Sequence, residues 1–119
     1  MIQSRINIYF LLASRSKTGL IHNIISSTDD ILTPPSRNID GGSKNIDEYI
    51  KDITKEFISV DYNSLNFIVT DINISNNILN LNYMCWLHPQ YLKKDAQFSL
   101  INIQNLLYDK NVQAIIKFI

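Results

Sequence analysis

Residues 40–61 read DGGSKNIDEYIKDITKEFISVD and contain the best-defined helix of the sequence. Asn45 is a favourable N-cap residue, and Glu48 three positions later completes a capping-box pattern. Apolar side chains then recur at the spacing of one helix face: Ile46, Tyr49, Ile50, Ile53 and Phe57. The stretch therefore predicts a helix from Ile46 to about Ser59 that packs one side on a core.

Another side of this helix carries a row of carboxylates. Glu48, Asp52 and Glu56 are spaced four residues apart, so they line up along the helix. Such a row could hold Mg²⁺ or Ca²⁺, which prefer oxygen ligands. The other interpretation is a solvated acidic face balanced by Lys51 and Lys55, and we favour it because most charge runs are solvated.

Outside the helix, four segments have the β-branched and aromatic composition of strands: residues 5–14, 20–26, 65–74 and 78–87. Turn residues at 15–19 and 75–77 join them into two hairpins. We expect a long loop over 27–42 with a short edge piece at 31–33, and a short strand at 96–100. Residues 102–119 predict one or two short helices, interrupted at 109–111.

This order of elements predicts an α/β (α+β) fold, a mixed β-sheet sandwiched between helices. The chain has 119 residues and is expected to form one domain over 1–119. The formal net charge is zero, which gives no basic field for nucleic acid or an anionic membrane. The apolar run near the start is too short to span a bilayer and is interpreted as a strand rather than a signal peptide.

Residues 40–61 also resemble the Nudix box. Gly41 is followed after five residues by Asp47, where that family has Glu. Seven residues later come Lys55 and Glu56 in place of Arg-Glu, and Phe57 takes the apolar position. The upstream Pro35 resembles the proline that precedes the family's Gly-Gly.

The sequence then departs from the box. Ser59 and Val60 stand where the family has a Glu-Glu pair, and Tyr62 stands where it has Gly. The order of elements over residues 5–118 is nevertheless similar to that of Nudix domains. The resemblance therefore implies a Nudix-like domain with a degenerate box.

Nudix enzymes cleave a diphosphate joined to another moiety, with divalent metal held by the box glutamates. By this resemblance Glu56 would be the surviving carboxylate, and Asp47 and Lys55 would be a supporting pair that braces the loop and the helix. Serine is a poor ligand for Mg²⁺ and valine is none. The resemblance therefore implies a fold without the usual metal-ligand pattern.

Three interpretations remain open. The first, which we favour, is a non-catalytic domain without a cofactor, serving as a structural or interaction subunit of a larger assembly. The second is a divergent hydrolase of nucleoside diphosphate-linked substrates that uses Mg²⁺ on Glu48, Asp52 and Glu56, or a ligand such as Asp29 or Asp71. The third is an unrelated α/β domain whose match to the box is chance.

For the first interpretation, the expected interface residues are Trp86, Tyr91 and Phe118, at the predicted exits from the sheet and at the terminus. The expected partners are other protein chains, as a homo-oligomer or a larger complex. The alternative is that Trp86 belongs to the core. The single cysteine, Cys85, indicates a reduced compartment, and the Ile- and Asn-rich composition suggests an AT-rich genome. We therefore expect a location in the cytoplasm or in a viral particle.

No other catalytic constellation is predicted. His22 lies inside a strand, where a lone histidine is usually structural. Cys85 and His88 are three residues apart in a strand and project to opposite faces, so they are not expected to form a dyad.

Overall fold

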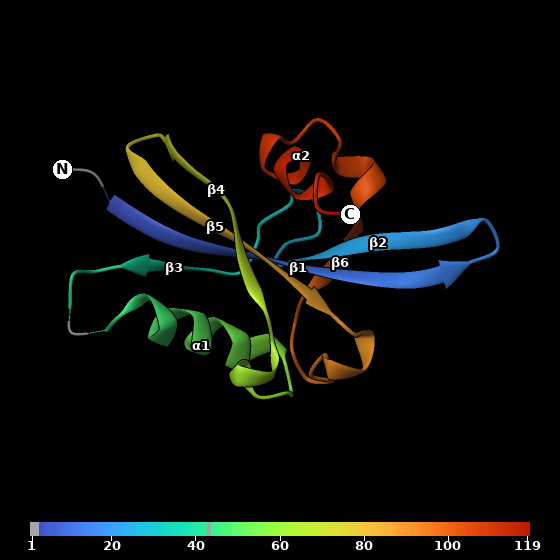
Figure 1. Cartoon of the computed structure of the whole chain (residues 1–119), viewed down its shortest axis with the longest axis horizontal. Helices are drawn as coiled ribbons and strands as arrows, with labels where there is room; N and C mark the ends of the chain where they lie inside the picture. Colours follow the sequence, from blue (N-terminus) through green and yellow to red (C-terminus); the bar gives the residue numbers. More distant parts are fainter. Residues whose placement is uncertain (1–2, 43) are drawn as a thin grey trace.

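The computed structural model describes residues 3–42 and 44–119, which form a mixed β-sheet with a helix on each face (Figure 1). The strands are β1 (Gln3–Ser16), β2 (Gly19–Ser26), β3 (Ser36–Ile39), β4 (Phe67–Ser75), β5 (Ile78–Leu87) and β6 (Ser99–Asn102). The helices are α1 (Ile46–Phe57) and α2 (Lys110–Ile116), with 3-10 turns η1 (Tyr62–Ser64), η2 (Pro89–Tyr91) and η3 (Ile103–Leu106). The predicted fold class is confirmed.

Strand β1 is the centre of the sheet, whose order is β4-β5-β1-β2-β6. One edge of β1 pairs in parallel with β5 along ten residues, from Gln3–Ile78 to Leu12–Leu87. The other edge is shared, because β3 pairs with its first half and β2 with its second half, both antiparallel. β1 is buried over residues 6–12, where it is covered on both faces, and this explains the apolar run at residues 8–12.

The two faces of the sheet carry separate cores. On the α1 side, Ile50, Ile53 and Phe57 of the helix belong to the same buried cluster as Ile8 and Phe10 of β1. On the α2 side, the buried residues are Tyr9, Leu11, Ile24, Met84, Ile103, Leu106, Val112 and Ile115. Consecutive strand residues point to opposite faces, so β1 contributes to both cores in alternation.

The predicted apolar face of α1 is confirmed except at its first residue. Tyr49, Ile50, Ile53 and Phe57 are buried, but Ile46 is 41% exposed. Helical side chains lean toward the N-terminus of their helix. The side chain of a first residue therefore extends past the turn that packs on the sheet.

Two short strands lie elsewhere than predicted. The edge strand is β3 at 36–39, not 31–33, and β6 begins at Ser99 rather than at residue 96. The hydroxyl oxygen of Ser26 accepts a hydrogen bond from the Thr33 amide at 2.9 Å and holds residues 27–33 as a loop. Pairing with β1 begins only after Pro35, whose carbonyl accepts from the Ile8 amide at 2.9 Å. The sequence of β3 is mostly polar and has no alternation of apolar and polar residues, so it was not predicted as a strand.

The predicted turn and helix interruption are confirmed. Asn76 and Asn77 join β4 to β5 with φ of 52° and 62°, a conformation that asparagine tolerates. Asp109 caps α2, because its carboxylate accepts from the amides of Asn111 and Val112. Within the described residues, no helix has both the length and the apolarity needed to cross a membrane.

Cys85 provides a test of the α1-side core. Its side chain is buried, and burial raises the pKa of the thiol to about 12. Only the thiolate attacks disulfide reagents, so we expect no labelling of the folded protein by an aromatic disulfide at pH 8. Full labelling is expected once denaturant unfolds the chain. Rapid stoichiometric labelling without denaturant would contradict this packing.

Candidate functional site

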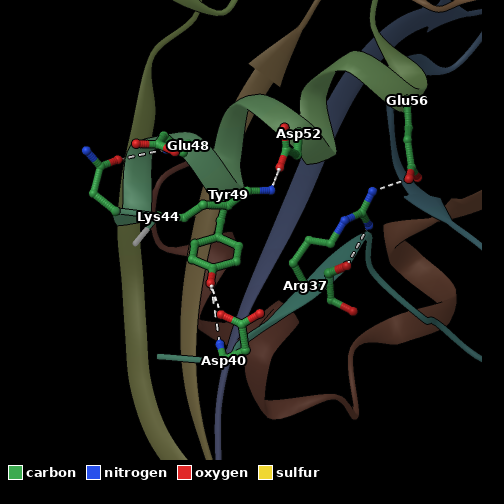
Figure 2. A network of polar contacts seen from close by, with 9 residues as sticks. Arg37, Asp40, Lys44, Glu48, Tyr49, Asp52 and Glu56 are labelled. Carbon is green, nitrogen blue, oxygen red and sulfur yellow. Dashed lines mark hydrogen bonds and ion pairs between the residues drawn. The ribbon is translucent and has the colours of Figure 1, made fainter. Parts of the chain in front are cut away.

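The carboxylate row of α1 lies beside β3 and the loop that follows it (Figure 2). The Asn45 side-chain oxygen accepts from the Glu48 amide at 3.0 Å, which confirms Asn45 as the N-cap. Asp52 accepts from the Lys44 ammonium group at 2.7 Å, and Glu56 pairs with the Arg37 guanidinium group. Two of the three carboxylates are therefore committed to cations of the chain (Figure 2).

The electrostatics of this row follow from these pairs. The hydrogen bond and the charge of Lys44 lower the pKa of Asp52, and Asp52 in turn raises the pKa of Lys44. Both pairs are partly exposed, so each adds little to stability. Their effect is on chemistry, because a metal ion would have to compete with an ammonium or guanidinium group for these oxygens.

Gly41 and Gly42 lie in the loop that precedes α1. Gly41 has φ of +74°, a conformation that favours glycine. The Asp40 carboxylate accepts from the Gly42 amide at 3.0 Å and from the Tyr49 hydroxyl at 2.8 Å (Figure 2). These two bonds, the amide first, lower the pKa of Asp40. The loop is thus tied to α1 by hydrogen bonds.

At the two departures from the box, the side chains have structural roles. The Ser59 hydroxyl donates to the Tyr91 carbonyl at 3.0 Å. Val60 is partly buried and packs against the α1-side core. Neither side chain is a good ligand for Mg²⁺, because a neutral serine hydroxyl is a poor ligand and valine has no ligand atom.

The supporting pair implied by the family resemblance is not formed. Asp47 accepts from the Tyr62 hydroxyl at 3.1 Å, and Lys55 forms no ion pair with it. Tyr62, which stands where the family has Gly, is therefore the hydrogen-bond partner of Asp47. The physical reason is reach, because Asp47 and Lys55 lie two turns apart on one helix.

The other proposed ligands do not converge on Glu56. Asp29 accepts from the Ser99 hydroxyl beside β6. Asp71 accepts from Asn73 and lies with Asn111 on the α2 side of the sheet. Across residues 3–42 and 44–119, no group of three or more His, Cys, Asp or Glu side chains is placed to share a metal ion. The residues present do not fit a catalytic Mg²⁺ site, and no reaction step through such an ion follows from them.

A pocket of about 480 Å³ opens at the C-terminal end of α1. Ser59 and Val60 line it together with Lys51, Lys55 and Lys93. Lys93 lies on the loop after β5, and its amide donates to the Phe57 carbonyl at 2.8 Å. The sequence offered no signal for this lysine cluster, because 38 residues separate Lys55 from Lys93.

Two of the three predicted interface residues, Trp86 and Tyr91, lie on different faces of the sheet. Trp86 is 41% exposed and its ring lies 5.7 Å from that of His22, so it is not a fully buried core residue. Tyr91 packs against the α1-side core, with its ring 6.0 Å from that of His88. Phe118, near the C-terminus, is 46% exposed. Trp86 follows the α1-side residue Cys85 in strand β5, so it faces the α2 side and Tyr91 does not share its face.

Comparison with solved structures places this arrangement among known folds. A mutT/nudix family protein from Listeria innocua superposes with a TM-score of 0.74 at 11% identity, covering 97% of this chain and 92% of that one. The Caenorhabditis elegans Ap4A hydrolase superposes with a TM-score of 0.65 at 9% identity, covering 99% and 98%. The NUDIX domain of Shewanella oneidensis NrtR, complexed with ADP ribose, gives 0.54 at 12% identity, covering 91% and 77%.

At the level of sequence, no family profile and no curated protein matches this chain. The likeness that the solved structures show is one of fold. It covers nearly the whole chain and includes the glycine loop, the box helix and the mixed sheet. The chain has a Nudix-like fold.

Proposed function

We propose that this chain is a non-catalytic Nudix-like domain that acts by binding, as a structural or interaction subunit. One observation carries the proposal: Glu56, the last acidic residue of the box pattern on α1, is paired with Arg37, and Ser59 and Val60 occupy the places of the missing glutamates. Catalysis of diphosphate cleavage needs clustered metal charge to stabilise phosphate oxygens and activate water. A single carboxylate already bound to arginine does not supply that cluster.

The alternative is a divergent metal-dependent hydrolase. The solved structures support it by their fold, since one of them is an Ap4A hydrolase and another binds ADP ribose. In this alternative Glu48, Asp52 and Glu56 would hold Mg²⁺ after Lys44 and Arg37 moved away. The binding function is favoured because it requires no such rearrangement.

The test is an assay with the purified full chain, Mg²⁺ or Mn²⁺, and a panel that includes Ap4A, ADP-ribose and nucleoside diphosphate sugars. We expect no phosphate or nucleotide release above the buffer rate, because the ligand set is broken. Product is measured by chromatography, which detects every cleavage position.

Two variants make the result decisive. Turnover that disappears in Glu56→Gln, but persists in the matched change Asp95→Asn on an exposed loop, would overturn the non-catalytic function. Turnover that is equal in both variants indicates a contaminating enzyme and leaves the proposal supported.

Association with other protein chains, in the cytoplasm or in a viral particle, stays a prediction. Trp86 and Phe118 are the exposed aromatic residues that support it, and Tyr91 is the weaker candidate because it packs on the core.

A further inference from the structure

The outer edge of strand β4 is open. Strand β4 stands at one end of the sheet order β4-β5-β1-β2-β6 (Figure 1). Among the described residues, no backbone hydrogen bond joins residues 67–75 to any segment but β5. The opposite edge of the sheet is β6, which has only four residues, whereas β4 has nine. A long edge strand presents a row of unpaired N–H and C=O groups that another strand can bind.

The geometry of the β4–β5 hairpin identifies which backbone groups of β4 face outward. Ser75 and Ile78 flank the two-residue turn and form its hydrogen-bonded pair, and such pairs then alternate along the two strands. The Asn77 carbonyl fits this pattern, because it accepts from the first amide of β1, so the odd-numbered residues of β5 direct their backbone groups toward β1. Ile72 and Ile74 lie opposite odd-numbered residues of β5. Their N–H and C=O groups therefore point away from β5, at the open edge.

The same two residues carry exposed apolar side chains. Ile72 is 58% exposed and Ile74 is 61% exposed. Their cross-strand partners on β5 are Leu81 and Leu79, which are half-buried, and Leu81 packs against the α1-side core. Directly opposite residues point to the same face of a sheet, so the isoleucines extend the apolar α1 side beyond the part that the chain itself covers.

The features that protect natural edge strands are confined to one half of β4. The pairing register shifts between Val69 and Asp71, which marks a bulge that would interrupt an approaching strand at residue 70. Residues 71–75, DINIS, continue regularly from there to the turn. They contain no proline or lysine and carry one charge, at Asp71. A second strand can therefore pair with residues 71–75.

The charges beside this stretch favour a second copy of the chain as the partner. Asp71 and Ser75 line one pocket together with Lys110, which forms no ion pair closer than 4.0 Å among the described residues. When two identical strands pair antiparallel about a two-fold axis, each end of one strand meets the other end of its copy. Asp71 then lies opposite Ser75 of the second copy, beside the pocket that holds the second copy's Lys110. Opposite charges thus meet on both sides of the axis, and the stretch complements itself.

We propose that two copies of this chain pair antiparallel through residues 71–75 of β4, so that their sheets join into one. Ile72 of each copy pairs with Ile74 of the other, which uses every outward N–H and C=O group of both residues. The isoleucines of the two copies then form one apolar cluster on the α1 side. The proposal rests on the proposed function, since it names the surface and the partner of the interaction subunit.

The first experiment is light scattering on the full chain after size-exclusion chromatography, from low micromolar to millimolar concentrations. We expect the mass to rise from that of one chain to twice that mass. Ile72→Lys and Ile74→Lys should each raise the dissociation constant by on the order of tenfold or more, because each places like charges near the two-fold axis and removes apolar contacts. The matched control is Ile31→Lys, at an isoleucine that is 70% exposed in the loop before β3 and should dimerise like the parent.

The second experiment is amide hydrogen exchange of the parent chain, followed by NMR at low and high concentration. The amides of Ile72 and Ile74 should exchange more slowly at high concentration, because they are hydrogen-bonded only in the dimer. The Asn73 amide is the internal control, since Asn73 pairs with Asn80 of β5 within one chain. Its exchange should be slow at both concentrations.

A monomer at every concentration would overturn the inference. So would a dimer that persists in both β4 variants, a loss in Ile31→Lys as large as theirs, or Ile72 and Ile74 amides that exchange equally fast at both concentrations. Protection of these amides only by a different protein would overturn the second copy as the occupant of the edge. Turnover lost in Glu56→Gln would instead overturn the proposed function, whereas the mass and exchange measurements would still decide on the dimer.

Discussion

Ile53→Asp is expected to lower the free energy of unfolding by about 3–4 kcal/mol. Ile53 is fully buried in the centre of the α1 face and contacts the same core as Ile8 and Phe10 of β1. A carboxylate at this position would have no partner and would lose its hydration, and the apolar contacts of isoleucine would be lost as well. Chemical denaturation followed by circular dichroism measures the change.

The matched control is Ile46→Asp on the same helix. Ile46 is 41% exposed in the first turn, where a negative charge is favourable. It should unfold within about 0.5 kcal/mol of the parent. If Ile53→Asp melted like the parent, the packing of α1 on the sheet would be wrong.

Asn82→Asp is expected to cost about 3 kcal/mol at pH 7, because it places a charge inside the α2-side layer. Asn82 is fully buried, accepts from Asn7 at 2.9 Å and donates to Asn111 at 3.2 Å. A carboxylate keeps the first hydrogen bond but loses the second, since it has no proton to donate to the Asn111 oxygen. Asp71 and Asn111 line the same pocket, so the Asp71 carboxylate would repel the carboxylate introduced at residue 82.

The pH dependence of this variant distinguishes charge from shape. Burial raises the pKa of the introduced carboxyl above its unfolded value of about 3.9. Stability relative to the parent is therefore nearly retained below about pH 4 and is lost as the pH rises through the folded pKa. Asn105→Asp, an exposed position in η3, should show no such loss in denaturant titrations at pH 3 and pH 7. An equal cost at both pH values would mean that the damage is steric.

The α1 helix, the two hairpins and the break before α2 were predicted from the sequence because their signals are local. A helix start needs only Asn45 and the amides that follow it, and a tight turn needs only Asn76 and Asn77. The period of the apolar residues also identified the buried face of α1. The resemblance to the Nudix box depended on spacing within one loop and one helix and stays a prediction, whereas the Nudix-like fold is confirmed.

The partners of the charged side chains could not be predicted from local signals. Glu56 meets Arg37 across 19 residues, and Lys93 reaches the end of α1 from a loop 38 residues beyond Lys55. These encounters depend on β3 pairing with β1 and on the loop after β5 folding back onto the helix. An ion pair acts over a few ångströms and carries no periodic pattern along the chain.

The sequence alone therefore determined the longer strands, the helix α1 and which side of α1 is buried, but it misplaced the short strands β3 and β6. The tertiary structure alone decided that the remaining carboxylates are paired, that Asp47 belongs to Tyr62, and that three lysines surround one pocket. The physical reason is range. Hydrogen bonds to the neighbouring backbone and the burial of an apolar stripe can be inferred from adjacent residues, whereas the field at a pocket is the sum of charges that only folding brings together.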